Sequence, residues 1–133
     1  MLIEAVGHAY LGEYFSACAS LVKPGGRVVL QTISMPDDRY ARYLNTNDSI
    51  REVVFPGSCC PSLAAMCEAA DAAGLELIDL EEMNQHYALT LQVWREAFDA
   101  ARPEIARMGY DESFMRMWHY YLAYCEAGFA EDH

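Results

Sequence analysis

A carboxylate and an imidazole lie close together near the start of the sequence. Glu4 and His8 are separated only by Ala5-Val6-Gly7, just ahead of a segment with helical periodicity. A carboxylate in such a position could accept hydrogen bonds from a ligand or act as a general base. The competing interpretation is an exposed N-terminal glutamate, and spacing alone favours it. His8 has the same two interpretations, and the second places it simply near the start of the next helix.

A second pair of candidates follows a Lys-Pro-Gly-Gly turn. The run Val28 to Ile33 is mostly apolar and rich in β-branched residues, which predicts a strand covered on both faces within an α/β sheet. Ligands of open α/β sheets bind outside the carboxyl ends of the strands. We therefore expect the Gln31 side chain and the Ile33 backbone N–H to face a small polar ligand. The alternative for Gln31 is a structural role, in which its polar side chain is simply hydrogen-bonded at the end of the strand.

The second half of the chain supplies a tyrosine and many aromatic rings. Tyr87 is expected in a polar loop over residues 84–87, from which its hydroxyl could orient a ligand. The rings that follow recur at helical spacing, which more often makes a core but could also line a groove for an acyl chain. They are Trp94, Phe98, Tyr110, Phe114, Trp118, Tyr120, Tyr121, Tyr124 and Phe129.

The five cysteines do not form a recognisable metal or disulfide pattern. Their number is odd and no Cys-x-x-Cys occurs, which favours reduced thiols. The possible zinc ligands Cys59, Cys60, Cys67 and His86 match no common spacing, so we expect no metal site.

Bulk properties exclude several classes of function. The net charge of -11 opposes binding to nucleic acid, and no apolar run reaches the length of a membrane span. We expect a cytoplasmic protein, with a peripheral position at the inner membrane surface as a variant of that prediction.

The elements predicted along the chain alternate between helices and two strands. Helices are expected over residues 10–21, 39–54, 63–73, 89–108 and 111–127, with Ser62 and Asp111 as N-caps, and a second strand over 75–80. One domain, residues 1–133, is predicted. Because two strands make a poor sheet, they must pair through a crossover or receive strands from another chain.

Five stretches together resemble the C-terminal half of the cyclopropane fatty acid and mycolic acid synthase family. The resemblance covers essentially the whole chain in order and spacing. The stretches are Ile3-Glu4-Ala5-Val6-Gly7-His8, Leu21 to Ile33, Phe55-Pro56-Gly57 with Pro61-Ser62-Leu63, His86-Tyr87 through Trp94, and Met117 to Phe129.

The resemblance implies a partial class I methyltransferase sheet, Rossmann-like, with few strands and a helix-rich C-terminal half. Its members use S-adenosylmethionine to add a methylene unit to the double bond of an unsaturated acyl chain, usually in a phospholipid, and a bound bicarbonate takes the proton. By resemblance, Glu4, the Ile33 backbone and Tyr87 help to hold bicarbonate, with Glu4 and Tyr87 as catalytic residues. Gln31 replaces a histidine of several members, and its amide could take over that contact. Trp94, Phe114, Trp118 and Tyr121 would line the acyl channel.

Compared with the family pattern, these 133 residues lack the glycine-rich cofactor loop and the acidic residue for the ribose. We therefore expect a truncated or split enzyme, inactive alone, that needs a partner chain for the cofactor-binding half. The alternative is a non-catalytic module that binds lipid or fatty acid or mediates oligomerisation. Exposed sheet edges favour a homodimer, with exchange of elements as one form of it.

Overall fold

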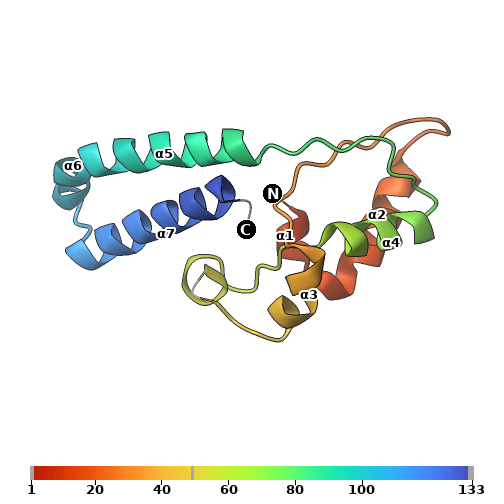
Figure 1. The fold of residues 1–133 in the computed structure, drawn as a ribbon, viewed down its shortest axis with the longest axis horizontal. Coiled ribbons are helices and arrows are strands. Elements are labelled where there is room, and N and C mark those ends of the chain that lie inside the picture. The colour runs from red at the N-terminus through yellow and green to blue at the C-terminus, as the bar shows by residue number, and fades with distance from the viewer. Residues whose placement is uncertain (1, 49, 132–133) are drawn as a thin grey trace. The chain divides into compact units, whose positions relative to one another are not determined.

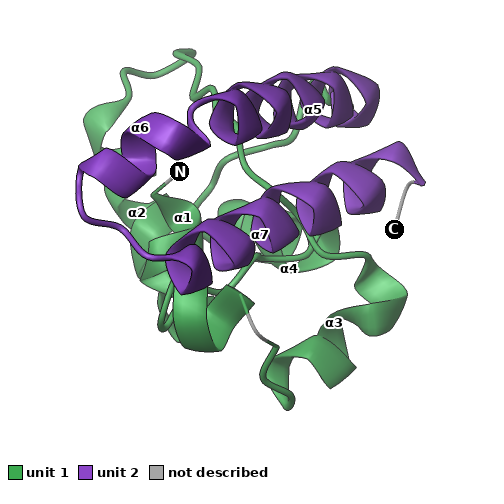
Figure 2. Cartoon of the chain, turned by 90° about the vertical axis from the view of Figure 1, so that its left-hand side faces the viewer, with its two compact units in different colours: residues 1–80 green, residues 81–133 purple. Residues whose placement is uncertain are grey.

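The computed structural model of the chain describes residues 2–48 and 50–131, and it separates into two compact units. The first unit is Met1–Leu80 and the second is Glu81–His133, coloured separately in Figure 2. The single domain expected over residues 1–133 stays a prediction.

Short helices connected by long irregular segments make up the first unit (Figure 1). Helices α2 and α4 pack against each other, and α1 packs against α2. The elements are α1 (Ile3–Val6), the 3-10 turn η1 (His8–Tyr10), α2 (Leu11–Leu21), α3 (Asp37–Leu44), the π-helical turn η2 (Ile50–Val54) and α4 (Leu63–Ala72).

The core of this unit forms where α1, α2 and α4 meet. Its buried residues are Ile3, Leu11, Phe15 and Met66. Leu30 and Leu75 pack against this cluster from the two segments predicted as strands. Apolar burial of this kind drives the helices together. Helices α2 and α4 lie within the ranges predicted for them, residues 10–21 and 63–73.

The prediction of two strands is wrong, because neither is formed in the described residues. Val28–Ile33 and Leu75–Leu80 form no strand, and the isolated parallel bridge that does form joins Met35 to Ser62. Val29 is 94% exposed, so the first segment is not covered on both faces as predicted. A β-strand requires a neighbouring strand for its backbone hydrogen bonds, and these segments have none among the described residues.

Two details of the first unit correct or confirm the predicted helices. The helix expected over residues 39–54 is instead α3 followed by an irregular segment and η2; Ser49, within that range, lies outside the described residues. The predicted N-cap of α4 is confirmed, because the Ser62 hydroxyl accepts a hydrogen bond from the Ala65 N–H at 3.3 Å. Gly74 follows α4 with φ of 78°, a conformation that favours glycine.

The second unit is a pair of long helices with a short one between them: α5 (Asn84–Ala100), α6 (Arg102–Arg107) and α7 (Glu112–Ala130). The predicted loop over residues 84–87 is wrong, because these residues form the first turn of α5. The helix predicted over 89–108 is interrupted at Ala101. Helix α6 then begins at Arg102 and has Pro103 in its first turn, where a missing N–H is tolerated. Asp111 caps α7 as predicted and accepts from the Phe114 N–H at 2.8 Å.

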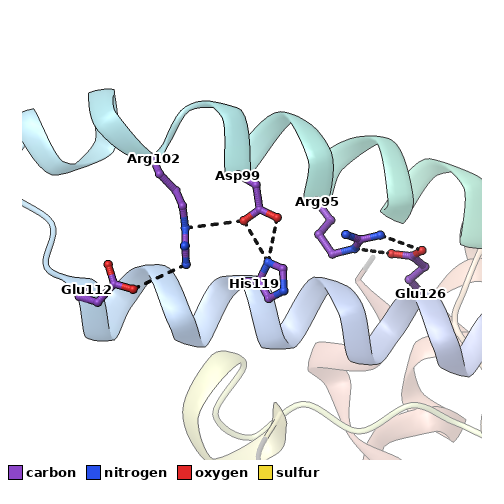
Figure 3. Close-up of polar contacts among 6 residues, drawn as sticks. All are labelled: Arg95, Asp99, Arg102, Glu112, His119 and Glu126. Carbon is purple, nitrogen blue, oxygen red and sulfur yellow. Dashed lines mark hydrogen bonds and ion pairs between the residues drawn. The ribbon is translucent and has the colours of Figure 1, made fainter.

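Charged side chains join α5 to α7 along one side of this pair (Figure 3). The Arg95 guanidinium donates two hydrogen bonds to the Glu126 carboxylate, at 2.7 and 3.2 Å, and this contact lowers the pKa of Glu126. Asp99 contacts His119 at 3.0 Å. These groups are partly exposed, so the pairs are screened by solvent and contribute little to stability. Their main effect is on the register of the two helices.

Two leucines of α2 provide a matched test of the core. Leu11 is 4% exposed and Leu21 is 86% exposed. We expect Leu11→Ala to lower the free energy of unfolding by about 2–5 kcal/mol, because it leaves a cavity in the core. Leu21→Ala should change it by less than about 0.5 kcal/mol. Urea unfolding followed by circular dichroism measures both, and equal losses would contradict this core.

Candidate functional site

Glu4 is the buried carboxylate of the first unit. Its side chain lies on α1 and is only 7% exposed, so it is not the exposed N-terminal glutamate of the alternative interpretation. Oε1 accepts hydrogen bonds from the Thr32 hydroxyl and the Ile33 backbone N–H, both at 2.9 Å. Oε2 is buried and has no hydrogen-bond partner among the described residues. A buried acceptor left unpaired is costly, so Oε2 marks a position where a donor is expected.

The backbone of Glu4 is fixed from the other side by the loop before α4. The Cys59 N–H donates to the Glu4 carbonyl oxygen at 2.7 Å. That loop is held in turn by Arg51, whose guanidinium donates to the carbonyl oxygens of Tyr43, Thr46 and Ser58 and lies over the Tyr43 ring. Segments far apart in the sequence therefore hold Glu4 in place.

His8, which is exposed, forms a second polar contact in this unit with a buried residue. Its Nδ1 lies 2.8 Å from the Tyr40 hydroxyl on α3, and the two rings meet edge to face. Burial, together with the neighbouring Cys59, raises the pKa of Tyr40 to about 12. The neutral phenol can therefore donate its proton to His8 at physiological pH. His8 starts η1, as its helix-start interpretation anticipated.

Of the two residues expected at the end of the first predicted strand, Ile33 contacts Glu4 and Gln31 does not. Gln31 is exposed, and no contact joins it to Glu4 in the described structure. The Ile33 N–H is already donated to Glu4.

Thr32, between these two residues, was missed by the sequence interpretation. In an extended chain neighbouring side chains point to opposite sides, so Thr32 shares the inward side with Leu30. A polar residue on that side was the signal available in the sequence.

The aromatic candidates lie in the second unit. Three of the predicted channel residues, Phe114, Trp118 and Tyr121, form one series of contacting rings on α7, with centroids 6.1 and 5.5 Å apart. Trp94 lies on α5 and is 55% exposed. Tyr87, also on α5, packs against Phe129 with centroids 4.9 Å apart. Their roles in an acyl channel and in ligand binding stay predictions.

The structure offers no arrangement for a metal among the residues it describes. In the described ranges, no group of three or more His, Cys, Asp or Glu side chains could hold an ion. Cys59 is buried, and burial raises the pKa of the Cys60 thiol to about 11. A neutral thiol is a poor metal ligand and a poor nucleophile. No described helix is long and apolar enough to cross a membrane.

Comparison with solved structures defines the class of the fold. The chain resembles mycolic acid cyclopropane synthase CmaA1, solved with SAH and CTAB, with a TM-score of 0.82 and 28% identity over 96% of this chain. It also resembles the cyclopropane synthase MmaA2 of Mycobacterium tuberculosis, with a TM-score of 0.73. These neighbours have the class I methyltransferase fold, so the predicted fold class is confirmed although the predicted strands are not.

The model of the family described as mycolic acid cyclopropane synthetase matches residues 1–133, and the chain belongs to this family. It is 43% identical over 129 residues to the tuberculostearic acid methyltransferase UfaA1 of Mycobacterium tuberculosis. It is 33% identical over 128 residues to the cyclopropane-fatty-acyl-phospholipid synthase of Escherichia coli. Both alignments cover 96% of this chain.

The chain corresponds to only part of these relatives. It spans 30% and 32% of the two curated proteins and 48% of the solved CmaA1 chain. What the comparisons establish for these residues is membership in an S-adenosylmethionine-dependent methyltransferase family.

The raised pKa of Tyr40 predicts how stability depends on alkaline pH. The folded pKa of about 12 lies above the ordinary value of 10.0, so the neutral phenol stabilises the fold below pH 10. This contribution should be lost as the pH rises from 10 toward 12. Urea unfolding across that range should show a smaller loss for Tyr40→Phe than for the parent chain, and the exposed control Tyr120→Phe should behave like the parent. An unchanged loss in Tyr40→Phe would contradict the buried Tyr40.

Proposed function

We propose that this chain contributes the proton-accepting side of a methylene transfer from S-adenosylmethionine to the double bond of an unsaturated acyl chain in a phospholipid. The observation that carries the proposal is the buried Glu4 Oε2, which has no hydrogen-bond partner among the described residues. The chain is also related to a cyclopropane-fatty-acyl-phospholipid synthase. In this reaction S-adenosylmethionine supplies the one-carbon unit and bicarbonate receives the proton that is lost.

The Glu4 carboxylate is compatible with bicarbonate. Bicarbonate carries one O–H group, which can donate to a carboxylate oxygen such as Oε2, while its other oxygens need donors. Within this unit, the Gln31 amide is the side-chain donor that the family resemblance predicts, and it is exposed. Because the Ile33 N–H already donates to Oε1, we expect Ile33 to act on the ligand through Glu4 rather than directly.

The cofactor requires polypeptide outside these 133 residues. No strand followed by a glycine-rich loop occurs in this sequence, so nothing here matches a site for S-adenosylmethionine. We propose that the missing loop and ribose carboxylate come from a further polypeptide segment, joined to this chain or separate from it. The term completed enzyme denotes this chain together with that segment.

The aromatic series on α7 is the proposed acyl-binding element. Phe114, Trp118 and Tyr121 present contiguous ring surface, and Met115 and Leu122 of the same helix are buried. Apolar, polarisable surface of this kind suits a flexible hydrocarbon chain.

Two measurements test the proposed function. Isothermal titration of the 133-residue chain with S-adenosylmethionine should give no micromolar binding, because the loop that holds it is not in this sequence. In the completed enzyme, Glu4→Gln should lower methylene transfer by at least about 100-fold, as loss of a positioned proton-transfer group does. The exposed control Glu13→Gln should retain activity. Micromolar binding by the chain alone, or an active Glu4→Gln enzyme, would contradict the proposal.

A second candidate function, an oligomerisation or lipid-binding module, is favoured by the exposed apolar residues of the two extended segments. Val29, Leu77, Ile78 and Leu80 are each more than half exposed. Extended backbone without a neighbouring strand is a template for pairing with another chain. We propose that two copies pair through these segments when no cofactor-binding segment is present.

Light scattering tests this association. The chain at high micromolar concentration should have the mass of a dimer, and Val29→Lys with Ile78→Lys should shift it toward the monomer, since charged edges oppose strand pairing. The same double change made at the exposed α5 positions Leu89 and Val93 is the control and should leave the dimer intact. A monomer in the parent chain would rule out the proposed pairing.

A further inference from the structure

The Glu4 carboxylate is bound asymmetrically. Both of its donors, the Thr32 hydroxyl and the Ile33 N–H, reach Oε1 at 2.9 Å. Oε2 receives no hydrogen bond from the described residues and is fully enclosed. Two donors on one oxygen restrict rotation of the carboxylate plane, so the direction in which Oε2 points is fixed before any ligand binds.

The Thr32 hydroxyl has one proton and two nearby acceptors. The Glu4 Oε1 lies at 2.9 Å and the Ile33 carbonyl oxygen at 3.1 Å. The shorter contact is to a carboxylate, and charge-assisted hydrogen bonds are stronger than neutral ones, so we assign the proton to Glu4. Thr32 is then the side chain that, with a backbone group, sets the orientation of Glu4.

Other groups in the first unit do not share this function. Gln31 is exposed, and the Tyr40 hydroxyl is directed to His8. Cys59 contacts the backbone of Glu4 and not its carboxylate.

We propose that Thr32 is a positioning residue: its hydroxyl holds Glu4 Oε1 so that Oε2 stays free for the proton-donating oxygen of the ligand. The inference rests on the proposed function, in which that ligand is bicarbonate. Without the hydroxyl, one restraint on the carboxylate is lost. The carboxylate can then rotate, so that either oxygen accepts from the Ile33 N–H and Oε2 no longer has a fixed direction. The ligand would have to fix the carboxylate on binding, and its apparent affinity would fall.

The experiment compares Thr32→Val, which keeps the shape and removes the hydroxyl, with Thr32→Ser, which keeps the hydroxyl. In the completed enzyme, Thr32→Val should lower kcat by about 10- to 100-fold, the range expected for a lost hydrogen bond to a charged group. It should also raise the bicarbonate concentration needed for half-maximal rate and leave KM for the acyl substrate unchanged. Thr32→Ser should restore both values to within about threefold of the parent.

Thr46→Val is the matched control. The Thr46 hydroxyl is exposed and donates to the Arg42 carbonyl oxygen at 3.0 Å, not to Glu4. The substitution leaves the Thr46 backbone carbonyl, which accepts from Arg51, in place. We expect parent kinetics from this variant. Urea unfolding of the 133-residue chain identifies any variant that fails to fold, and the Ile33 amide signal in its 1H–15N spectrum should move in Thr32→Val and not in Thr46→Val.

The outcomes separate the two proposals. If Glu4→Gln is inactive and Thr32→Val has parent kinetics, the positioning role of Thr32 is overturned and the proposed function stands. Equal losses in Thr32→Val and Thr32→Ser would also overturn it, since the hydroxyl would then not be the group that matters. If Glu4→Gln keeps full activity, the proposed function itself fails.

Discussion

One buried glutamate joins three segments of the first unit that are distant in sequence. Glu4 on α1 receives hydrogen bonds from Thr32 and Ile33, and its carbonyl oxygen receives one from Cys59. Burying a charge requires such partners, because an isolated ionised group in an apolar environment is very unfavourable. The core of Ile3, Leu11, Phe15 and Met66 lies beside this bridge. The position of α1, the path of residues 32–33 and the loop before α4 are therefore constrained by one residue, through its side chain and its backbone carbonyl.

The two segments that resemble strands show how strongly β-structure depends on its neighbours. Leu30 and Leu75 pack inward as strand residues would, yet neither segment forms a strand in the described part of the chain. Helices satisfy their backbone internally and so form in both units, whereas a strand is completed only by another strand. The family fold remains recognisable, with a TM-score of 0.82, because the helices and the paths between them are retained.

The second unit is organised on a different principle. Its two long helices are joined by the Arg95–Glu126 and Asp99–His119 contacts on one side (Figure 3), and by packing around Leu91, Met115 and Leu122. The aromatic series of α7 adds ring contacts within one helix, which depend on its own periodicity. Polar pairs thus join α5 to α7 on one side, while the aromatic series runs along α7 itself.

The sequence by itself determined helices α2, α4 and α7, the caps at Ser62 and Asp111, and the family, because periodicity and capping are local and the five family stretches keep their order. It also pointed to Glu4 and Ile33, but it could not tell a buried Glu4 from an exposed one. Only the tertiary structure decided that Glu4 is enclosed, that Thr32 rather than Gln31 contacts it, and that Tyr40 reaches His8. Tertiary structure also decided against the two strands, since their formation depends on partners that no local pattern encodes. Contacts between residues about 30 positions apart follow from how segments pack, and packing is a property of the whole unit.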